Sequence, residues 1–172
     1  MQRGCRKFFF ETEIVIKSHC CKQHERRDYF RQELCSSIMK IELINKKVES
    51  LVMKPLEGSS SGKKTMKATV TLNNELYSNV KDAKIFRVRY FAYVTIEERL
   101  EMEITYDFDF RSEEDFSDDT ARSPEVRSLA PSIAYPYIKG YAEQIIHMSN
   151  LGSFNLPYFD FFSSPMEPNN NK

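Results

Sequence analysis

The chain has 172 residues, and its 25 basic and 25 acidic side chains cancel to a formal net charge of zero. A chain of this length typically forms one domain, and a composition of 41% apolar and 29% charged residues is that of a folded protein. Because no overall field attracts nucleic acid, we expect no nucleic-acid partner, and a charged partner has to be recognised by a local patch.

The beginning of the chain predicts neither an export signal nor a membrane anchor. The apolar run at Phe8–Phe10 is too short for a signal peptide and is followed by Glu11 and Glu13. No stretch approaches the roughly 20 apolar residues that cross a bilayer. Cysteines in a chain without a secretion signal are expected to stay reduced, which predicts a cytoplasmic protein. The four cysteines are Cys5, Cys20, Cys21 and Cys35.

Three parts are predicted along the chain: an N-terminal extension of uncertain structure over residues 1–36, one domain over residues 37–162, and a polar tail over residues 163–172. Within the extension, His19, Cys20, Cys21 and His24 supply zinc-binding side chains. Neither a Cys-x-x-Cys nor a His-x-x-x-His pair, both typical of zinc sites, is present. Reduced cysteines therefore explain these residues better than a metal site, and we expect no cofactor.

Four segments alternate apolar and polar side chains with a period of two, which predicts β-strands. The connectors between the last three are short, so antiparallel neighbours are expected, because a parallel return needs a crossover of a dozen or more residues. In the first strand, Asn45–Lys47 interrupts the alternation, which predicts a β-bulge. The predicted strands cover residues 38–51, 66–72, 85–94 and 100–110.

After an acidic stretch, the apolar period changes to that of a helix. Ser123 is expected to cap this helix, and Pro124 to be its first residue. Pro131 and Pro136 lie inside the pattern, so the helix either begins after Pro136 or is kinked there. Gly152 is the expected stop. The apolar positions that recur at intervals of three or four are Leu129, Ile133, Tyr137, Tyr141, Ile145 and Met148. The sequence thus predicts an α+β fold, a four-stranded antiparallel sheet packed with one long C-terminal helix.

The segment Gly58–Thr65 partly matches a phosphate-binding loop. Its glycines, Gly58 and Gly62, are separated by three residues instead of four, and Lys64 stands where Ser or Thr would hold magnesium. A predicted strand follows, whereas a phosphate cradle needs the N-terminus of a helix. A solvated linker is the better interpretation.

Four carboxylates are expected on one face of the last predicted strand: Glu101, Glu103, Asp107 and Asp109. They are spread along the strand, and no pocket is indicated that would separate their pKa values for acid–base chemistry. Two interpretations stay open, a solvated edge that discourages aggregation and a docking face for a basic partner. No Ser-His-Asp or Cys-His arrangement is indicated, so we do not expect an enzyme.

Residues 154–162 contain five aromatic side chains and one leucine: Phe154, Leu156, Tyr158, Phe159, Phe161 and Phe162. Part of this stretch is expected to cover the core. Burying one large apolar side chain contributes about 1.5–3 kcal/mol, so an apolar patch left uncovered is costly unless it receives a partner.

Three short motifs near the end of the chain stand in a characteristic order. Tyr135-Pro136-Tyr137 lies in the predicted helix, Gly152-Ser153-Phe154 at its end, and Leu156-Pro157 after it. In this order the segment resembles the first helix and following loop of the SecB export chaperones. The resemblance extends over residues 41–110, where four strands recur in the family's order, but residues 1–36 have no family counterpart.

This resemblance implies an ATP-independent holdase that binds non-native chains in apolar grooves beside the sheet. It also implies a homotetramer, a dimer of dimers packed through the first helix, with Tyr137, Tyr141 and Ile145 at the interface. The groove residues implied are Leu51, Met53, Met66, Val70, Leu72, Phe154, Leu156, Tyr158, Phe159 and Phe162. For each of these, core packing remains the alternative.

The expected partners are unfolded or precursor polypeptides. Residues 163–172 are not expected to form the family's second helix, so a translocase motor is carried over only as a further candidate beside an antitoxin. The alternative function is a dedicated adaptor, or a module associated with a toxin–antitoxin system, that recognises one protein through the acidic strand face.

Overall fold

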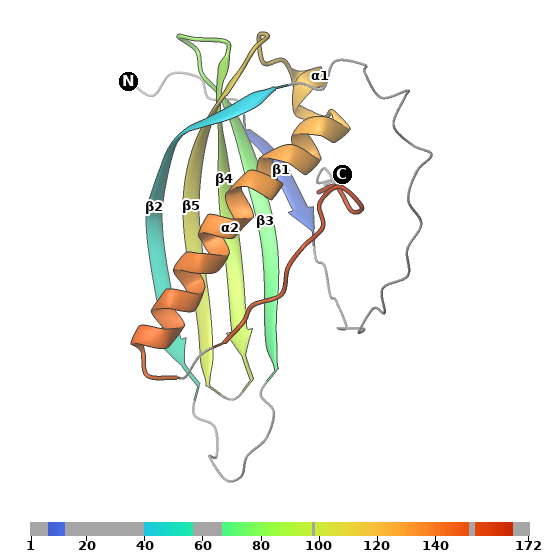
Figure 1. Cartoon of the computed structure of the whole chain (residues 1–172). Coiled ribbons are helices and arrows are strands. Elements are labelled where there is room, and N and C mark those ends of the chain that lie inside the picture. The colour runs from blue at the N-terminus through green and yellow to red at the C-terminus, as the bar shows by residue number, and fades with distance from the viewer. Residues whose placement is uncertain (1–6, 13–39, 57–66, 98, 152–153, 167–172) are drawn as a thin grey trace.

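The computed structural model describes residues 7–12, 40–56, 67–97, 99–151 and 154–166 (Figure 1). For residues 7–12 it gives the backbone path and strand pairing. Outside these ranges lie the four cysteines, His19, His24, Met66 and the segment Gly58–Thr65, so the predictions about them are not addressed by the structure.

One antiparallel sheet carries the fold, with the strand order β1-β3-β4-β5-β2. The predicted α+β fold is confirmed, and the four predicted strands are β2 to β5. The fifth strand, β1, belongs to the predicted extension, where three successive phenylalanines give no alternating pattern. The strands are β1 Lys7–Thr12, β2 Ile41–Pro55, β3 Ala68–Ser78, β4 Ile85–Ile96 and β5 Leu100–Ser112.

The predicted bulge in β2 is confirmed, and it is one of two. The register against β5 shifts between Leu43 and Asn45 and again between Val48 and Ser50. Each extra residue reverses which face the following side chains occupy. The first bulge therefore turns Asn45 away from the helix, and the second returns the apolar side chains that follow it to the helix side.

The long helix, α2, runs without interruption over Pro124–Met148, so it does not begin after Pro136. As predicted, Ser123 caps it, and the Ser123 hydroxyl accepts a hydrogen bond of 3.2 Å from the Val126 N–H. The helix ends at Met148, before the expected stop at Gly152, with Ser149 as its C-cap; Asn150 follows in the left-handed conformation (φ 59°), which asparagine tolerates well. In the part of the chain that the structure describes, neither α2 nor the one-turn helix α1 (Asp118–Ala121) could span a membrane.

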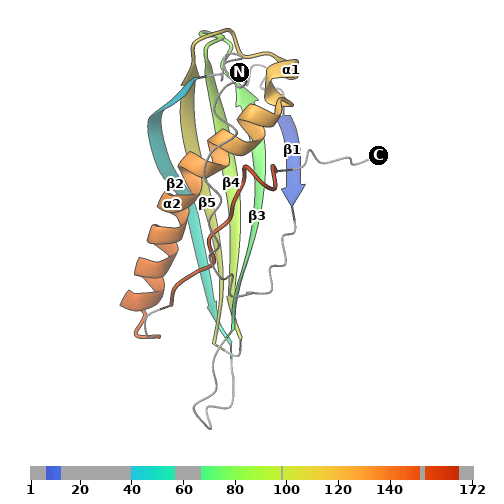
Figure 2. The same cartoon turned by 45° about the vertical axis from the view of Figure 1, so that its right-hand side comes forward.

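Figures 1 and 2 show α2 lying obliquely across one face of the sheet, from the β3 side near α1 to the β2 edge. We call the covered face the helix face and the opposite one the outer face. The helix α2 has 25 residues and is therefore about 38 Å long, which is enough to cross all the long strands. The core between sheet and helix is aromatic: the Phe86 ring stacks on Phe116 at 4.0 Å and on Phe110 at 5.4 Å.

Candidate functional site: apolar surfaces and a charged sheet face

After α2, the chain turns back and runs beside the helix on the β3 side, as both views show (Figures 1 and 2). We call residues 154–166 the C-terminal segment. The Lys139 ammonium donates to the Leu156 carbonyl at 2.8 Å, and the Glu143 carboxylate accepts from the Leu156 N–H at 2.7 Å. The Tyr135 hydroxyl donates to the Pro157 carbonyl at 2.6 Å. Helix side chains thus fix the first half of the segment through its backbone.

The far end of the segment is fixed by the proline inside α2. Pro131 has no N–H, which leaves the Arg127 carbonyl, four residues earlier, without its helical donor. The Met166 N–H donates to this carbonyl at 3.2 Å, and the Arg127 Nε donates to the Met166 carbonyl at 2.5 Å. The carbonyl that Pro131 leaves without a helical donor is therefore also the anchor of the segment.

The segment buries four of its seven large apolar side chains, leaves Phe154 half-buried and exposes the other two. Leu156, Phe159, Phe161 and Met166 are buried, and the Phe159 and Phe161 rings lie 4.7 and 5.9 Å from the Tyr135 ring. Tyr158 is 75% exposed and Phe162 is 67% exposed. The sheet face beside β3 is thus closed by this segment, while two aromatic rings remain in solvent.

On the other side of α2, apolar side chains stay open. Leu51 and Met53 of β2 are 37% and 41% exposed, although both lie on the helix face. The gap to the helix is bridged by a Lys46 ammonium 3.5 Å from the Tyr137 ring centre and by the Ser149 hydroxyl 3.7 Å from the Met53 sulfur. We call this surface the β2–α2 strip; it consists of Val48, Leu51, Met53, Tyr137, Tyr141, Ile145 and Met148.

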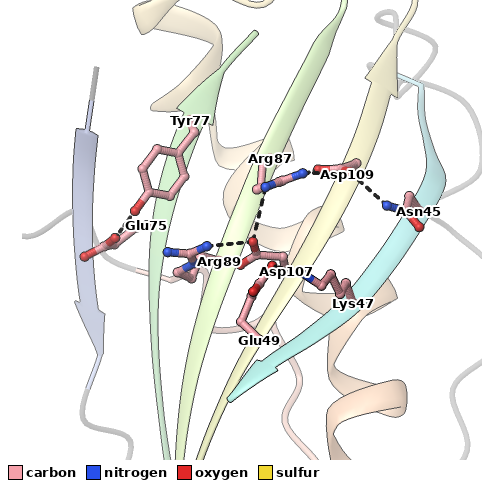
Figure 3. A network of polar contacts seen from close by, with 9 residues as sticks. All are labelled: Asn45, Lys47, Glu49, Glu75, Tyr77, Arg87, Arg89, Asp107 and Asp109. Atoms are coloured by element: carbon pink, nitrogen blue, oxygen red, sulfur yellow. Dashed lines mark hydrogen bonds and ion pairs between the residues drawn. The ribbon is translucent and has the colours of Figure 1, made fainter. Parts of the chain in front are cut away.

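The outer face carries polar side chains that pair across four strands (Figure 3). The Arg89 guanidinium binds both oxygens of Asp107, at 2.6 and 2.7 Å. Arg87 binds both oxygens of Asp109, at 2.6 and 3.1 Å, and also reaches Asp107 at 3.3 Å. We call the set the charged ladder; it comprises Asn45, Lys47, Glu49, Glu75, Tyr77, Arg87, Arg89, Asp107 and Asp109.

Contacts within the charged ladder shift the pKa values of Asp109 and Tyr77. Burial by itself would raise the pKa of Asp109, but hydrogen bonds from Arg87 and Asn45 hold it below its usual range. Burial and the neighbouring Glu75 carboxylate raise the pKa of Tyr77 to about 12, so its hydroxyl keeps its proton and donates to Glu75. Asp107 is buried. These aspartates are already paired with arginines and are therefore not free for a basic partner.

Glu101 and Glu103 differ from the two aspartates. Both are exposed and stand where the ladder ends. In the sheet register, Glu103 lies between Tyr93 of β4 and Val52 of β2. These side chains line a shallow cavity of about 230 Å³, which combines carboxylates with apolar surface. Of the four carboxylates in the predicted docking face, these two glutamates are the exposed ones.

A larger hollow of about 770 Å³ lies at the opposite end of the outer face, beside the turn between β3 and β4. Ile44 and Val80, 44% and 77% exposed, give it an apolar rim. Arg87 forms part of its wall, but all three guanidinium nitrogens already donate to aspartates. The hollow therefore combines apolar surface with the cationic side chains of Lys81, Arg87 and Arg89.

The residues predicted to line a client groove fall into separate places. Exposed are Leu51, Met53, Tyr158 and Phe162, and Phe154 is half-buried. In the core lie Val70, Leu72, Leu156 and Phe159. The predicted interface residues, Tyr137, Tyr141 and Ile145, belong to the β2–α2 strip together with Leu51 and Met53. One surface therefore carries both a predicted client site and a predicted oligomer interface.

Sequence reasoning missed the arginines of the ladder. Arg87 and Arg89 are two residues apart on one strand, as Asp107 and Asp109 are on the next. The antiparallel register of β4 and β5 places each arginine opposite one aspartate. This matching spacing on two neighbouring strands was the sequence signal from which the Arg–Asp pairs could have been predicted. Among the described residues, no group of three or more His, Cys, Asp or Glu side chains is arranged to hold a metal ion.

No protein-family model matches the sequence, and no curated protein sequence matches it either. Solved structures do match. The SecB-like chaperone Rv1957 of Mycobacterium tuberculosis, in complex with a ChAD peptide from the HigA1 antitoxin Rv1956, superposes with a TM-score of 0.59 at 12% identity. The match covers 69% of this chain and 89% of that chain. The fold is SecB-like.

A second structure, a protein of unknown function from Streptococcus agalactiae, gives a TM-score of 0.46 at 10% identity. It covers 70% of this chain and 98% of that one. The assignment of the SecB-like fold therefore rests on the match to Rv1957 and on the sheet and helix described above.

Proposed function

We propose that this protein is a SecB-like chaperone that holds non-native or unassembled polypeptides without ATP and without catalysis. The observation that carries the proposal is a SecB-like fold with large apolar side chains in solvent on both sides of α2. Exposed apolar patches in folded proteins mark interaction sites. The neighbour Rv1957 is a chaperone bound to a peptide, which supports a polypeptide as the ligand.

The two apolar surfaces differ in the ligand that each suits. The β2–α2 strip borders the edge strand β2 and contains Tyr137 and Met148 on the long helix, a surface that two copies can share. Tyr158 and Phe162 stand on the C-terminal segment, away from this strip. We assign self-association to the strip, and client binding to the aromatic pair on the segment.

Assembly strengthens such a client site. A micromolar complex needs about −8 kcal/mol after an association cost of at least about 4 kcal/mol, so two aromatic rings on one subunit bind weakly. Several copies of the site in one oligomer act at a high effective concentration on a long unfolded chain. This is the physical reason for a holdase to be multimeric, and a dimer of dimers fits it.

The buried groove residues have a different role in this proposal. Val70, Leu72, Leu156 and Phe159 fill the core, so they support folding and reach no client in the state described. Their substitution should unfold the protein before it weakens client holding.

Two matched variants test the division of the surfaces. In Tyr158→Ser/Phe162→Ser, suppression of the aggregation of a reduced, unfolded test protein should fall at least fivefold, with the oligomer mass unchanged. In Leu51→Ser/Met53→Ser, light scattering should report a smaller particle. Urea unfolding of both variants controls for stability. If the first variant suppresses aggregation as well as the wild type does, the proposed client site is wrong.

The alternative is a dedicated adaptor for one partner. Two observations favour it: Glu101 and Glu103 border a cavity of mixed polar and apolar lining on the outer face, and the ligand of the neighbour comes from an antitoxin. A dedicated adaptor would bind one protein, such as an antitoxin, and ignore a panel of unrelated unfolded proteins. Glu101→Lys/Glu103→Lys would then abolish co-purification with that partner and leave aggregation suppression unchanged. Binding across the panel, export precursors included, supports the general holdase.

A further inference from the structure

Strand β1 stands apart from the rest of the sheet. It lies at one edge, whereas β2, the next strand in the chain, lies at the opposite edge beyond β5. Its six residues pair only with β3, from Lys7 opposite Tyr77 to Thr12 opposite Leu72 (Figure 1). The four strands β3, β4, β5 and β2 are continuous in the sheet without it. β1 therefore resembles an added peptide more than an integral strand.

The stretch of β3 that pairs with β1 has the composition of a free edge. Its centre is Asn73-Asn74-Glu75, and asparagine and glutamate are depleted in β-strands. Polar and charged residues are common on edge strands, where they prevent unwanted strand pairing. The composition of this stretch is thus that of an edge strand.

The covered edge is also incompletely satisfied. Among the described residues, the side-chain carbonyls of Asn73 and Asn74 are buried without a hydrogen-bond donor. The hydroxyl of Tyr90, opposite Asn74 in the register, is buried without a partner as well. Unpaired buried polar groups oppose burial of the surface that holds them. These unpaired atoms make this part of β3 a weakly stabilised stretch of the sheet, whether or not β1 is paired with it.

The described pairing covers only part of this edge. β3 extends over Ala68–Ser78, and β1 pairs with Leu72–Tyr77.

We propose that the edge of β3 is a strand-acceptor site for an extended segment of a non-native polypeptide, which displaces β1. The sequence of β1, Lys-Phe-Phe-Phe-Glu-Thr, indicates the chemistry of the occupant: successive aromatic residues flanked by charges. Strand addition binds through main-chain hydrogen bonds, which every polypeptide offers. This deepens the proposed holdase function and rests on it, because non-native clients supply extended segments of this kind.

The tether decides how strongly β1 competes. A segment linked to its own site acts at an effective concentration of roughly millimolar, so a client in solution competes with β1 at a disadvantage. Removing the ability of β1 to pair should therefore strengthen client binding. If β1 were instead a structural part of the binding site, its loss would weaken client binding.

The test uses full-length chains with two proline substitutions or two valine substitutions. In Phe8→Pro/Phe9→Pro, one proline falls at a hydrogen-bonded position whatever the phase of the ladder. Phe8→Val/Phe9→Val is the matched control, since it retains both N–H groups and favours strands. The probe is a fluorescein-labelled peptide with the sequence of residues 6–13. Two further versions carry N-methyl groups at alternate backbone amides.

The proline variant should bind the peptide at least tenfold more tightly than the valine control, and one of the two N-methylated peptides should lose binding tenfold. Hydrogen exchange at Leu72–Tyr77 should be faster in the proline variant. In the wild-type chain, saturating peptide should move the amide resonances of residues 7–12 to unpaired positions, a result that does not depend on any variant.

Equal affinity for both variants would overturn the proposal. So would binding of both N-methylated peptides as tightly as the parent, because side chains and not the backbone would then hold the peptide. Aggregation suppression that persists without peptide binding rejects the strand-acceptor site alone. Peptide binding without aggregation suppression rejects the holdase and retains the site.

Discussion

The two sides of α2 carry similar apolar side chains that differ in their exposure to solvent. On the β3 side, Leu156 and Phe159 are buried because the C-terminal segment returns along the helix. On the β2 side, Leu51 and Met53 remain more than one-third exposed, since no segment of the described chain covers them. Hydrophobicity alone does not distinguish the two groups. The path of the chain after the helix decides which surface is core and which is available to a partner.

The contacts that hold each side differ as well. The closed side is fixed by hydrogen bonds between helix side chains and segment backbone, from Lys139, Glu143 and Tyr135. The open side has a cation over the Tyr137 ring, a weak hydroxyl–sulfur contact at Met53, and ring contacts of Tyr137 and Tyr141 with aromatic residues of β5. The closed side is thus held by hydrogen bonds to the backbone, which the contacts named for the open side do not include.

The largest expected effect comes from one substitution made on both sides. Leu156→Ala, at a residue 3% exposed, should lower the free energy of unfolding by about 2–5 kcal/mol, because a buried leucine leaves a cavity. Leu51→Ala, at a residue 37% exposed, should cost less than about 1 kcal/mol. Urea denaturation measures both. Similar losses in the two variants would mean that the sides do not differ as described.

A smaller effect is expected from removing one hydroxyl on each side. Tyr135→Phe leaves the Pro157 carbonyl without its donor and should cost about 1 kcal/mol. Tyr137→Phe removes a hydroxyl from a ring that is 41% exposed and should leave stability unchanged within about 0.5 kcal/mol. Thermal unfolding of the pair gives the comparison, and a larger loss in Tyr137→Phe would contradict it.

Gly140 lies on the exposed surface of α2, and a Cβ there would meet nothing within 4 Å. Gly140→Ala should therefore raise the free energy of unfolding by about 0.5–1 kcal/mol through helix propensity. If this face of α2 meets a second copy closely, the same substitution should lower the oligomer mass in light scattering. A destabilised monomer would show that the backbone at Gly140 is under a constraint that the structure does not contain.

The smallest effect concerns pH and the turn in the C-terminal segment. The Ser163 hydroxyl and backbone N–H groups bonded to Asp160 lower the pKa of its carboxyl below the ordinary 3.8. A lowered pKa stabilises the folded form above the ordinary value, and this contribution is lost as the pH falls through the folded value. An NMR titration of the Ser163 amide should have its midpoint below 3.8. A midpoint above that value would show that the turn is not formed.

The sequence was sufficient for what depends on local pattern. The alternation in β2 to β5, the bulge after Leu43, and the cap at Ser123 were predicted and are present. The uninterrupted course of α2 was not resolved in advance, because the donor that satisfies the Arg127 carbonyl comes from Met166, far along the chain.

Burial was harder to predict than secondary structure. Within residues 154–162, Phe159 is enclosed and Tyr158, its neighbour, is exposed. An extended segment turns successive side chains in opposite directions, and only the position of α2 and the sheet decides which direction is inward. The pairing of β1 with β3 is likewise a long-range contact without a periodic signal.

The account depends most on Tyr158 and Phe162 contacting non-native polypeptides. A photo-crosslinking amino acid placed at Phe162, 67% exposed, should become covalently linked to an unfolded test protein in the absence of nucleotide. The same amino acid at Val80, 77% exposed on the outer face, should link at least fivefold less. Equal linkage at both positions, or none at Phe162, would contradict the account.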